Sequence, residues 1–101
     1  MDFTVAWTDP GLADFADVIR YAAERNPTGA EALRLRILDS TDELARMPYL
    51  GAVYERDRSG RTREIQSGPY RSFYRVLDAL SQVQILRVWH GSRREPRLPP
   101  A

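Results

Sequence analysis

Apolar and polar residues alternate over the first seven positions of the chain, the pattern of a β-strand with one buried face. The apolar side of this predicted strand consists of Phe3, Val5 and Trp7. The sequence "TDPG" then ends the alternation, with Asp9 as the expected N-cap of a helix and Pro10 as its first residue. Because apolar residues recur at helical spacing after this point, we predict an amphipathic helix over residues 10–25.

A second helix is predicted directly after the first. Pro27 disfavours helical geometry at Asn26 and so ends the first helix. In "TGAE", Thr28 and Glu31 form a capping-box pattern that starts the second helix, which Pro48 ends. Its predicted inner face consists of Ala30, Leu33, Ile37 and Leu44. Because only about two residues connect them, the two helices should form an antiparallel hairpin.

The second half of the chain has the pattern of strands. Residues 49–60 are predicted to form a loop with a turn at Ser59 and Gly60. Residues 62–67 form a weak strand with little apolar content, which favours an edge position or a short length. Residues 70–77 and 82–90 are rich in aromatic and β-branched residues, and their short connection predicts antiparallel pairing.

The predicted order is therefore strand, helix, helix and three strands. Helices grouped together before a meander of strands indicate an α+β fold, β-α-α-β-β-β, with the helical hairpin packed on a small antiparallel sheet. A chain of 101 residues has room for one core. We expect a single domain over residues 1–93 and an extended, Pro/Arg-rich tail over residues 94–101.

Composition narrows the chemistry further. With no cysteine and one histidine, neither a disulfide nor a structural metal site is expected, and no pattern indicates a cofactor. No apolar run approaches the roughly 20 residues of a membrane span, and the N-terminus lacks a secretory pattern, so we expect a cytoplasmic protein without membrane contact.

Charge is distributed unevenly along the chain. Residues 1–50 carry 5 Arg and 9 acidic residues, and residues 51–101 carry 10 Arg and 5 acidic residues, which gives −4 and +5 and sums to the net +1. A basic half suits a phosphate-rich or acidic partner. All 15 basic residues are arginine, which binds phosphate but cannot act as a base. The acidic residues of the first helix are expected on a solvated face: Asp14, Asp17 and Glu24.

This order of elements, joined to "GPYRSFYRV", "VQILRVWHGSRR" and "MPYLG", resembles the RelE/ParE superfamily of toxins from bacterial type II toxin–antitoxin modules. The resemblance covers nearly the whole chain and implies a growth inhibitor of the plasmid-stabilisation type, neutralised by a cognate antitoxin. RelE-like members cut mRNA in the ribosomal A site, whereas ParE-like members inhibit DNA gyrase without nuclease chemistry. The target here is therefore either the ribosome with its mRNA or DNA gyrase, and a third alternative is an inert homologue that only binds antitoxin.

The resemblance also implies candidate site residues for a metal-independent endoribonuclease. RNA cleavage by the 2′-hydroxyl needs a base, cationic groups on the phosphate and an acid. Arg71 and Arg93 match arginines that would clamp the phosphate. His90 lies where some members place a catalytic histidine, a residue suited to proton transfer near neutral pH. Glu64 stands where RelE-like enzymes carry a lysine and is the candidate base.

Other features favour structural roles for the same residues. Thr62 and Glu64 replace two lysines of the RelE-type strand, and no aromatic residue follows Arg93. His90 can equally hydrogen-bond the turn that ends the sheet. Phe73 and Trp89 are expected to pack in the core rather than to stack on RNA bases. Tyr70 and Tyr74 are expected to pack under the helices. An exposed strand edge can support a homodimer when the antitoxin is absent.

Overall fold

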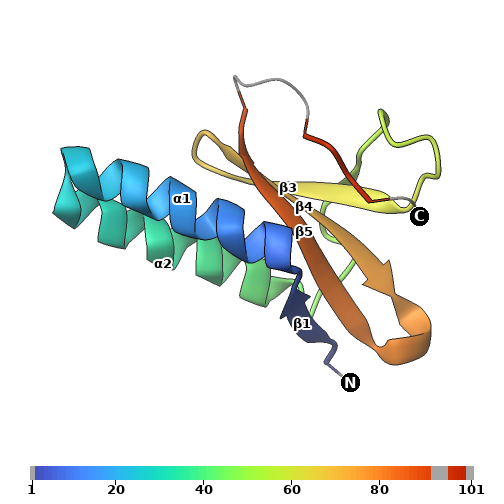
Figure 1. Cartoon of the computed structure of the whole chain (residues 1–101). Helices are drawn as coiled ribbons and strands as arrows, with labels where there is room; N and C mark the ends of the chain where they lie inside the picture. Colours follow the sequence, from blue (N-terminus) through green and yellow to red (C-terminus); the bar gives the residue numbers. More distant parts are fainter. Residues whose placement is uncertain (1, 92–95, 100–101) are drawn as a thin grey trace.

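The computed structural model describes residues 2–91 and 96–99 of the chain (Figure 1). Two long helices follow a short first strand, and the remaining strands come after them. The elements are β1 (Thr4–Trp7), α1 (Asp9–Arg25), α2 (Pro27–Glu43), β2 (Ala52–Val53), β3 (Thr62–Ser67), β4 (Tyr70–Leu77), a short 3₁₀ helix (Asp78–Leu80) and β5 (Gln82–His90). The predicted α+β class and order of elements are confirmed. None of the helices in the described part is both long and apolar enough to cross a bilayer.

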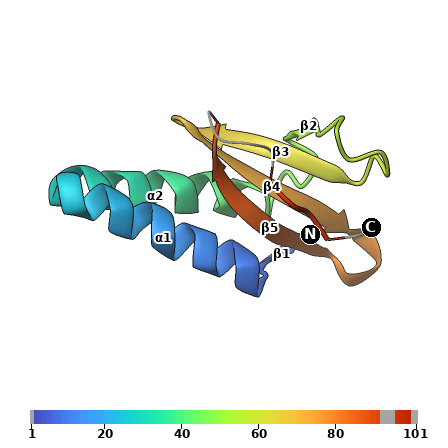
Figure 2. The same cartoon turned by 45° about the horizontal axis from the view of Figure 1, so that its top comes forward.

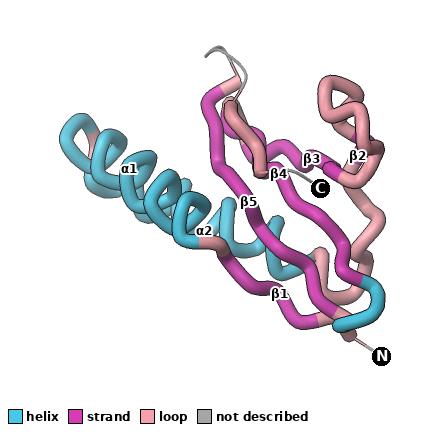
Figure 3. The backbone as a smooth tube through the Cα atoms, turned by 45° about the vertical axis from the view of Figure 1, so that its right-hand side comes forward, coloured by secondary structure: helices cyan, strands magenta, loops and turns pink. Residues whose placement is uncertain are grey.

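The strands form one sheet in the order β1-β5-β4-β3-β2. β5 pairs antiparallel with β4, as its short connection predicts, and β4 with β3. β1 runs parallel to β5, from Thr4 beside Gln82 to Trp7 beside Ile85, so the sheet is mixed rather than antiparallel (Figure 3). Alternation in one strand does not reveal which neighbour it will have or in which direction, and the sequence prediction was wrong on this point. β2, a strand of two residues within the predicted loop, was also missed.

The N-cap of each helix lies one or two residues before the predicted cap. The Thr8 hydroxyl accepts from the Gly11 N–H at 3.1 Å, so Thr8 rather than Asp9 caps α1. The same hydroxyl donates to the Ile85 carbonyl at 3.0 Å, which ties the start of α1 to β5. Asn26 caps α2 through the Gly29 N–H at 3.1 Å, and the predicted capping box does not form the start of that helix. Asn26 is therefore both the C-cap of α1 and the N-cap of α2.

The two helices lie against one face of the sheet, which we call the helix face, and their connecting turn projects beyond the strands (Figure 2). The core between them contains Leu44, Tyr74, Val83 and Ile85 as buried residues, with Val5, Trp7 and Ile65 packed against them. Ala30, Ile37 and Leu44 of the predicted inner face are buried, and Leu33 is partly buried. Burial of these side chains is the main stabilising contribution to the fold.

The opposite side of the sheet, which we call the open face, carries no helix of the described part of the chain. Successive residues of a strand point to opposite faces, so Tyr74 faces the helices while Phe73 faces the open side. Phe73 is nevertheless fully buried, and its ring meets that of Tyr54 edge-on at 4.8 Å. The C-terminal segment 96–99 is bonded to this face, because Arg87 donates to the Arg97 carbonyl at 3.1 Å and Arg75 to the Pro99 carbonyl at 2.5 Å.

Candidate functional site

Strand register gathers charged side chains on the open face. Glu64 lies opposite Phe73, and Gln66 lies opposite Arg71, so Glu64 and Arg71 are diagonal neighbours on the same side of the β3–β4 pair. Thr62 lies opposite Arg75 further along the same two strands. Two of the predicted site residues, Arg71 and Glu64, are therefore brought together.

Arg71 and Glu64 form a two-pronged ion pair. The Arg71 Nε and Nη2 atoms donate to the two Glu64 carboxylate oxygens at 3.0 and 3.2 Å. The side chains are 17% and 27% exposed, so water reaches both only partly. The Arg71 guanidinium also lies 4.9 Å from the Phe73 ring centroid and 5.6 Å from that of Tyr54. To bind a phosphate through the same fork, Arg71 would have to release Glu64.

Arg75 is buried in a second, denser network on the open face. Its guanidinium donates to the Thr62 hydroxyl at 3.1 Å, to Asp57 at 3.3 Å and to the Pro99 carbonyl. The hydrogen bond from the Thr62 hydroxyl is the main cause that lowers the pKa of the Asp57 carboxyl, to about 2. Hydrogen bonds from Ser59 and Arg75 also lower this pKa, whereas burial raises it. This network joins the 54–60 loop, β3, β4 and the C-terminal segment, so its role is structural.

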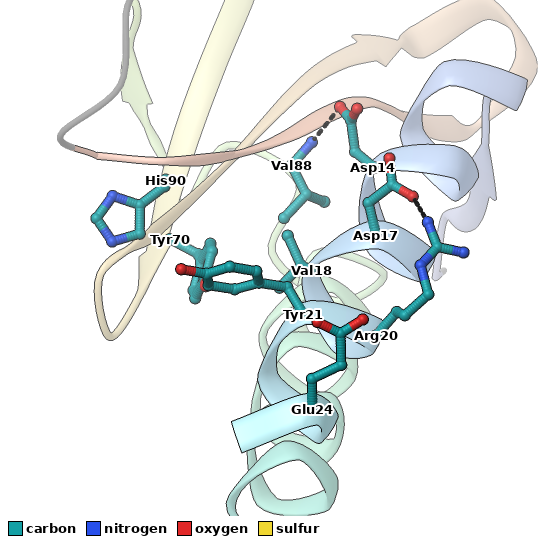
Figure 4. Close-up of a pocket in the computed structure, with 9 residues that line it drawn as sticks. All are labelled: Asp14, Asp17, Val18, Arg20, Tyr21, Glu24, Tyr70, Val88 and His90. Carbon is teal, nitrogen blue, oxygen red and sulfur yellow. Dashed lines mark hydrogen bonds and ion pairs between the residues drawn. The ribbon is translucent and has the colours of Figure 1, made fainter. Parts of the chain in front are cut away.

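His90 lies on the other side of the sheet from Arg71. It is opposite Tyr70 in the β4–β5 register, and the two rings meet edge-on at 5.2 Å on the helix face (Figure 4). Arg71, the next residue along β4, points to the open face opposite Trp89. His90 and Arg71 therefore do not face one phosphate. Arg93 lies outside the described residues. Of the three predicted site residues that are described, Arg71 and Glu64 are adjacent and His90 is apart from them.

A β-bulge explains this separation. Next to the short connection, β4 and β5 pair from Leu77 opposite Gln82 to Tyr74 opposite Ile85. The register then shifts by one residue, so that Phe73 is opposite Arg87 rather than Leu86. A shift of one residue moves every later side chain to the other face. Without the bulge, His90 would share a face with Arg71.

A cavity of about 650 Å³ opens between α1 and the end of β5, on the helix face. Its lining includes Asp14, Asp17, Tyr21 and Glu24 from one side of α1, with Tyr70 and His90 from the strands (Figure 4). The acidic stripe of α1 was predicted to be solvated, and this holds for Asp17, whose side chain is 66% exposed. The regular helical spacing of the four α1 residues is the signal that could have revealed this lining.

Asp14, by contrast, is an anchor between α1 and β5. Its carboxylate accepts from Arg87 at 2.6 and 3.0 Å and from the Val88 N–H at 3.1 Å, and the side chain is only 13% exposed. The bond to Asp14 raises the pKa of Arg87. The prediction of a solvated position is therefore wrong for Asp14, because the helix passes along the strand edge at this point. Within residues 2–91 and 96–99, no group of three His, Cys, Asp or Glu side chains is arranged to hold a metal ion.

Comparison with known proteins gives consistent results. The family model described as ParE toxin of type II toxin-antitoxin system, parDE, matches residues 5–95. A toxin–antitoxin complex, RelBE2 of Mycobacterium tuberculosis, is similar at 26% identity and TM-score 0.66, over 89% of this chain and 99% of that one. The chromosomal ParDE system of P. aeruginosa matches at 20% identity and TM-score 0.72, over 87% and 95%.

Other comparisons add only the fold. A free-state mutant of E. coli RelE is similar at 17% identity and TM-score 0.66, over 91% of this chain and 86% of that chain. No curated protein sequence matches the chain.

Proposed function

The chain belongs to the ParE toxin family of type II toxin–antitoxin systems, and we propose that it arrests growth by binding its target without cutting RNA. DNA gyrase is the target in this proposal, and a cognate antitoxin is the neutralising partner. The ParDE and RelBE structures that resemble this chain are toxin–antitoxin systems, which supports such a partner.

The observation that carries the proposal is the separation of the candidate catalytic groups. Cleavage by a 2′-hydroxyl requires a base, a phosphate clamp and an acid within hydrogen-bond reach of one phosphate. In the described part of the chain, the Arg71 fork is bonded to the Glu64 carboxylate, and His90 lies across the sheet. A toxin that acts by binding its target does not need these catalytic groups close together, because a stable binding surface is sufficient.

A second candidate, ribosome-dependent mRNA cleavage, is favoured by the position of Arg71 itself. Its guanidinium lies at the open face beside the rings of Tyr54 and Phe73, where a phosphate could compete for it. In that mechanism an incoming phosphate would displace Glu64 from Arg71, and the released carboxylate would take the proton of the 2′-hydroxyl as this oxygen attacks the phosphorus. The 5′-oxygen would leave as its bond to phosphorus breaks and would take a proton from water. His90 would take no part in it.

Induction of the chain from a tightly controlled promoter in bacteria separates the two candidates. We expect growth arrest, intact mRNA 5′ ends and gyrase-dependent double-strand breaks in DNA. Growth should recover when the small gene next to the toxin gene is expressed together with it. Cleavage of mRNA in phase with ribosomal A sites would overturn the proposal in favour of the second candidate.

A further inference from the structure

The loop between β2 and β3 is the tip of a β-hairpin and is dense in arginine. The two strands pair antiparallel, and beyond them the Tyr54 N–H donates to the Thr62 carbonyl at 2.8 Å, which closes the loop. Residues 55–61, "ERDRSGR", contain three arginines and two acidic residues. The loop projects at the end of the molecule away from the turn between α1 and α2 (Figure 1). It lies outside the cavity beside β5.

Two successive turns fix the backbone of this loop. The Asp57 N–H donates to the Tyr54 carbonyl at 3.2 Å, and the Gly60 N–H donates to the Asp57 carbonyl at 3.1 Å. The Ser59 N–H donates to the Asp57 carboxylate at 3.1 Å, and the Arg61 N–H donates to the Ser59 hydroxyl at 3.1 Å. Gly60 has a φ of +73°, which glycine adopts without strain. Because the loop is already ordered, binding through its side chains costs little backbone entropy.

The loop turns its central acid inward and its arginines outward. The Asp57 side chain is 16% exposed, and its carboxylate is paired with Arg75 of β4. Three arginines of the loop are exposed: Arg56, Arg58 and Arg61. Glu55 is the exposed acid of the loop, so three positive charges and one negative charge leave +2 on its outer surface. Among the described residues, no acid forms an ion pair with Arg58 or Arg61.

A fourth exposed arginine lies on the C-terminal segment beside this loop. Arg75 donates both to Asp57 and to the Pro99 carbonyl, so the segment adjoins the base of the loop. Arg97, two residues before Pro99, is exposed, and its carbonyl accepts from Arg87 at 3.1 Å. We call the basic surface that these exposed side chains form the arginine rim: Arg56, Arg58, Arg61 and Arg97.

The chemistry of the arginine rim favours phosphates over bases. A guanidinium forms charge-assisted hydrogen bonds with phosphate oxygens. Proteins that bind single strands also stack the bases on aromatic side chains, but residues 55–61 contain no aromatic residue and Tyr54, at the base of the loop, is buried. Duplex DNA presents closely spaced phosphates that cationic side chains on a rigid projection can contact without reading the bases.

We propose that the arginine rim binds the phosphate backbone of duplex DNA without sequence preference. The choice of DNA rests on the proposed function, because a toxin bound to DNA gyrase meets the duplex that the enzyme holds. In that complex the rim contacts the DNA while another surface of the toxin contacts the enzyme. Two linked contacts bind more tightly than one, so the toxin prefers gyrase with DNA to gyrase alone.

The test titrates a short, fluorescently labelled DNA duplex with the full chain and measures anisotropy at several salt concentrations. The variant Arg58→Gln/Arg61→Gln removes two charges of the rim. We expect it to bind about tenfold more weakly, and the slope of log affinity against log salt concentration to become shallower by about two. Thermal melting checks that the variant is folded.

The matched control is Arg20→Gln/Arg34→Gln, which removes the same net charge from exposed pairs on α1 and α2. It should bind the duplex as the wild type does. No binding to the duplex, or equal losses in both variants, would overturn the proposal. Tighter binding of the wild type to single-stranded RNA of the same length, or to polyglutamate, would also overturn it, in favour of RNA or of an acidic protein.

A supercoiling assay with purified DNA gyrase separates this proposal from the proposed function. Inhibition of gyrase without binding of the duplex would remove the role of the rim and leave the proposed function standing. Binding of the duplex through the rim without any inhibition of gyrase would do the reverse.

Discussion

The two faces of the sheet use charge in opposite ways. On the open face, Arg71 is paired with Glu64 and Arg75 with Asp57, and all four side chains are less than one-third exposed. On the helix face, the cavity beside β5 is lined by Asp17 and Glu24, and the Asp17 carboxylate forms an exposed pair with Arg20. The comparison shows that conspicuous arginines can be structural, while an acidic helix stripe that resembles ordinary surface can line a cavity.

The largest expected effect comes from the buried cation of the open face. Arg75→Met should reduce the free energy of unfolding by about 3–5 kcal/mol, because Asp57 and the Pro99 carbonyl lose their shared partner. Urea denaturation measures this change. Arg20→Met, which breaks an exposed pair on α1, is the control and should change stability by less than about 1 kcal/mol. Equal effects for both variants would show that the open face is not held by its ion pairs.

A smaller loss is expected at the Arg71–Glu64 pair. Glu64→Gln keeps the shape but removes the charge, so unfolding should become easier by about 2 kcal/mol. Growth arrest should persist once expression is matched to wild type. If the variant instead folds normally and loses toxicity, the pair belongs to a catalytic site and the structural account of the open face is wrong.

Acid should weaken the open face further. Asp57 has a folded-state pKa of about 2, below its unfolded value of about 3.9. Its contribution is therefore fully present above about pH 4 and is lost as the pH falls toward 2. We expect a loss of about 1 kcal/mol in this window, because water screens part of the effect.

Asp57→Asn tests this pH dependence by comparison with wild type. Urea midpoints measured across the acid range should fall less steeply in the variant, since its side chain does not titrate. Parallel curves for the two proteins would exclude Asp57 as the source of the acid sensitivity.

The smallest effect is expected at His90. His90→Gln removes the edge-on ring contact with Tyr70, which should cost about 0.5–1 kcal/mol in thermal stability. Because the ring faces away from Arg71, growth arrest should remain unchanged. Loss of toxicity at unchanged melting temperature would instead indicate a catalytic histidine.

Much of the fold was predictable from the sequence. The bounds of β4 and β5 match the predicted ranges, 70–77 and 82–90, because aromatic and β-branched residues are dense there and turn residues flank them. Direction was not predictable for β1, whose four residues alternate equally well in a parallel or an antiparallel pair. The start of α1 was misjudged because Thr8, besides capping the helix, bonds to β5, a contact distant in sequence.

The arrangement of the candidate site residues was less predictable than the fold, because of the β-bulge between β4 and β5. The spacing between Arg71 and His90 is consistent with a shared face only if β4 and β5 pair without interruption. The shift at Phe73 and Tyr74 reverses that relation. The extra residue at this shift is Leu86, which is buried. No local pattern in the sequence marks it, so the convergence of the four candidate residues could be tested only in three dimensions.

The most direct test of binding without nuclease chemistry uses the purified chain in two parallel assays. Supercoiling of relaxed plasmid by purified DNA gyrase should be inhibited in a dose-dependent manner. In a reconstituted translation reaction, primer extension should show mRNA of full length at the same toxin concentrations. Unimpaired supercoiling together with cleavage at ribosomal A sites would contradict the account.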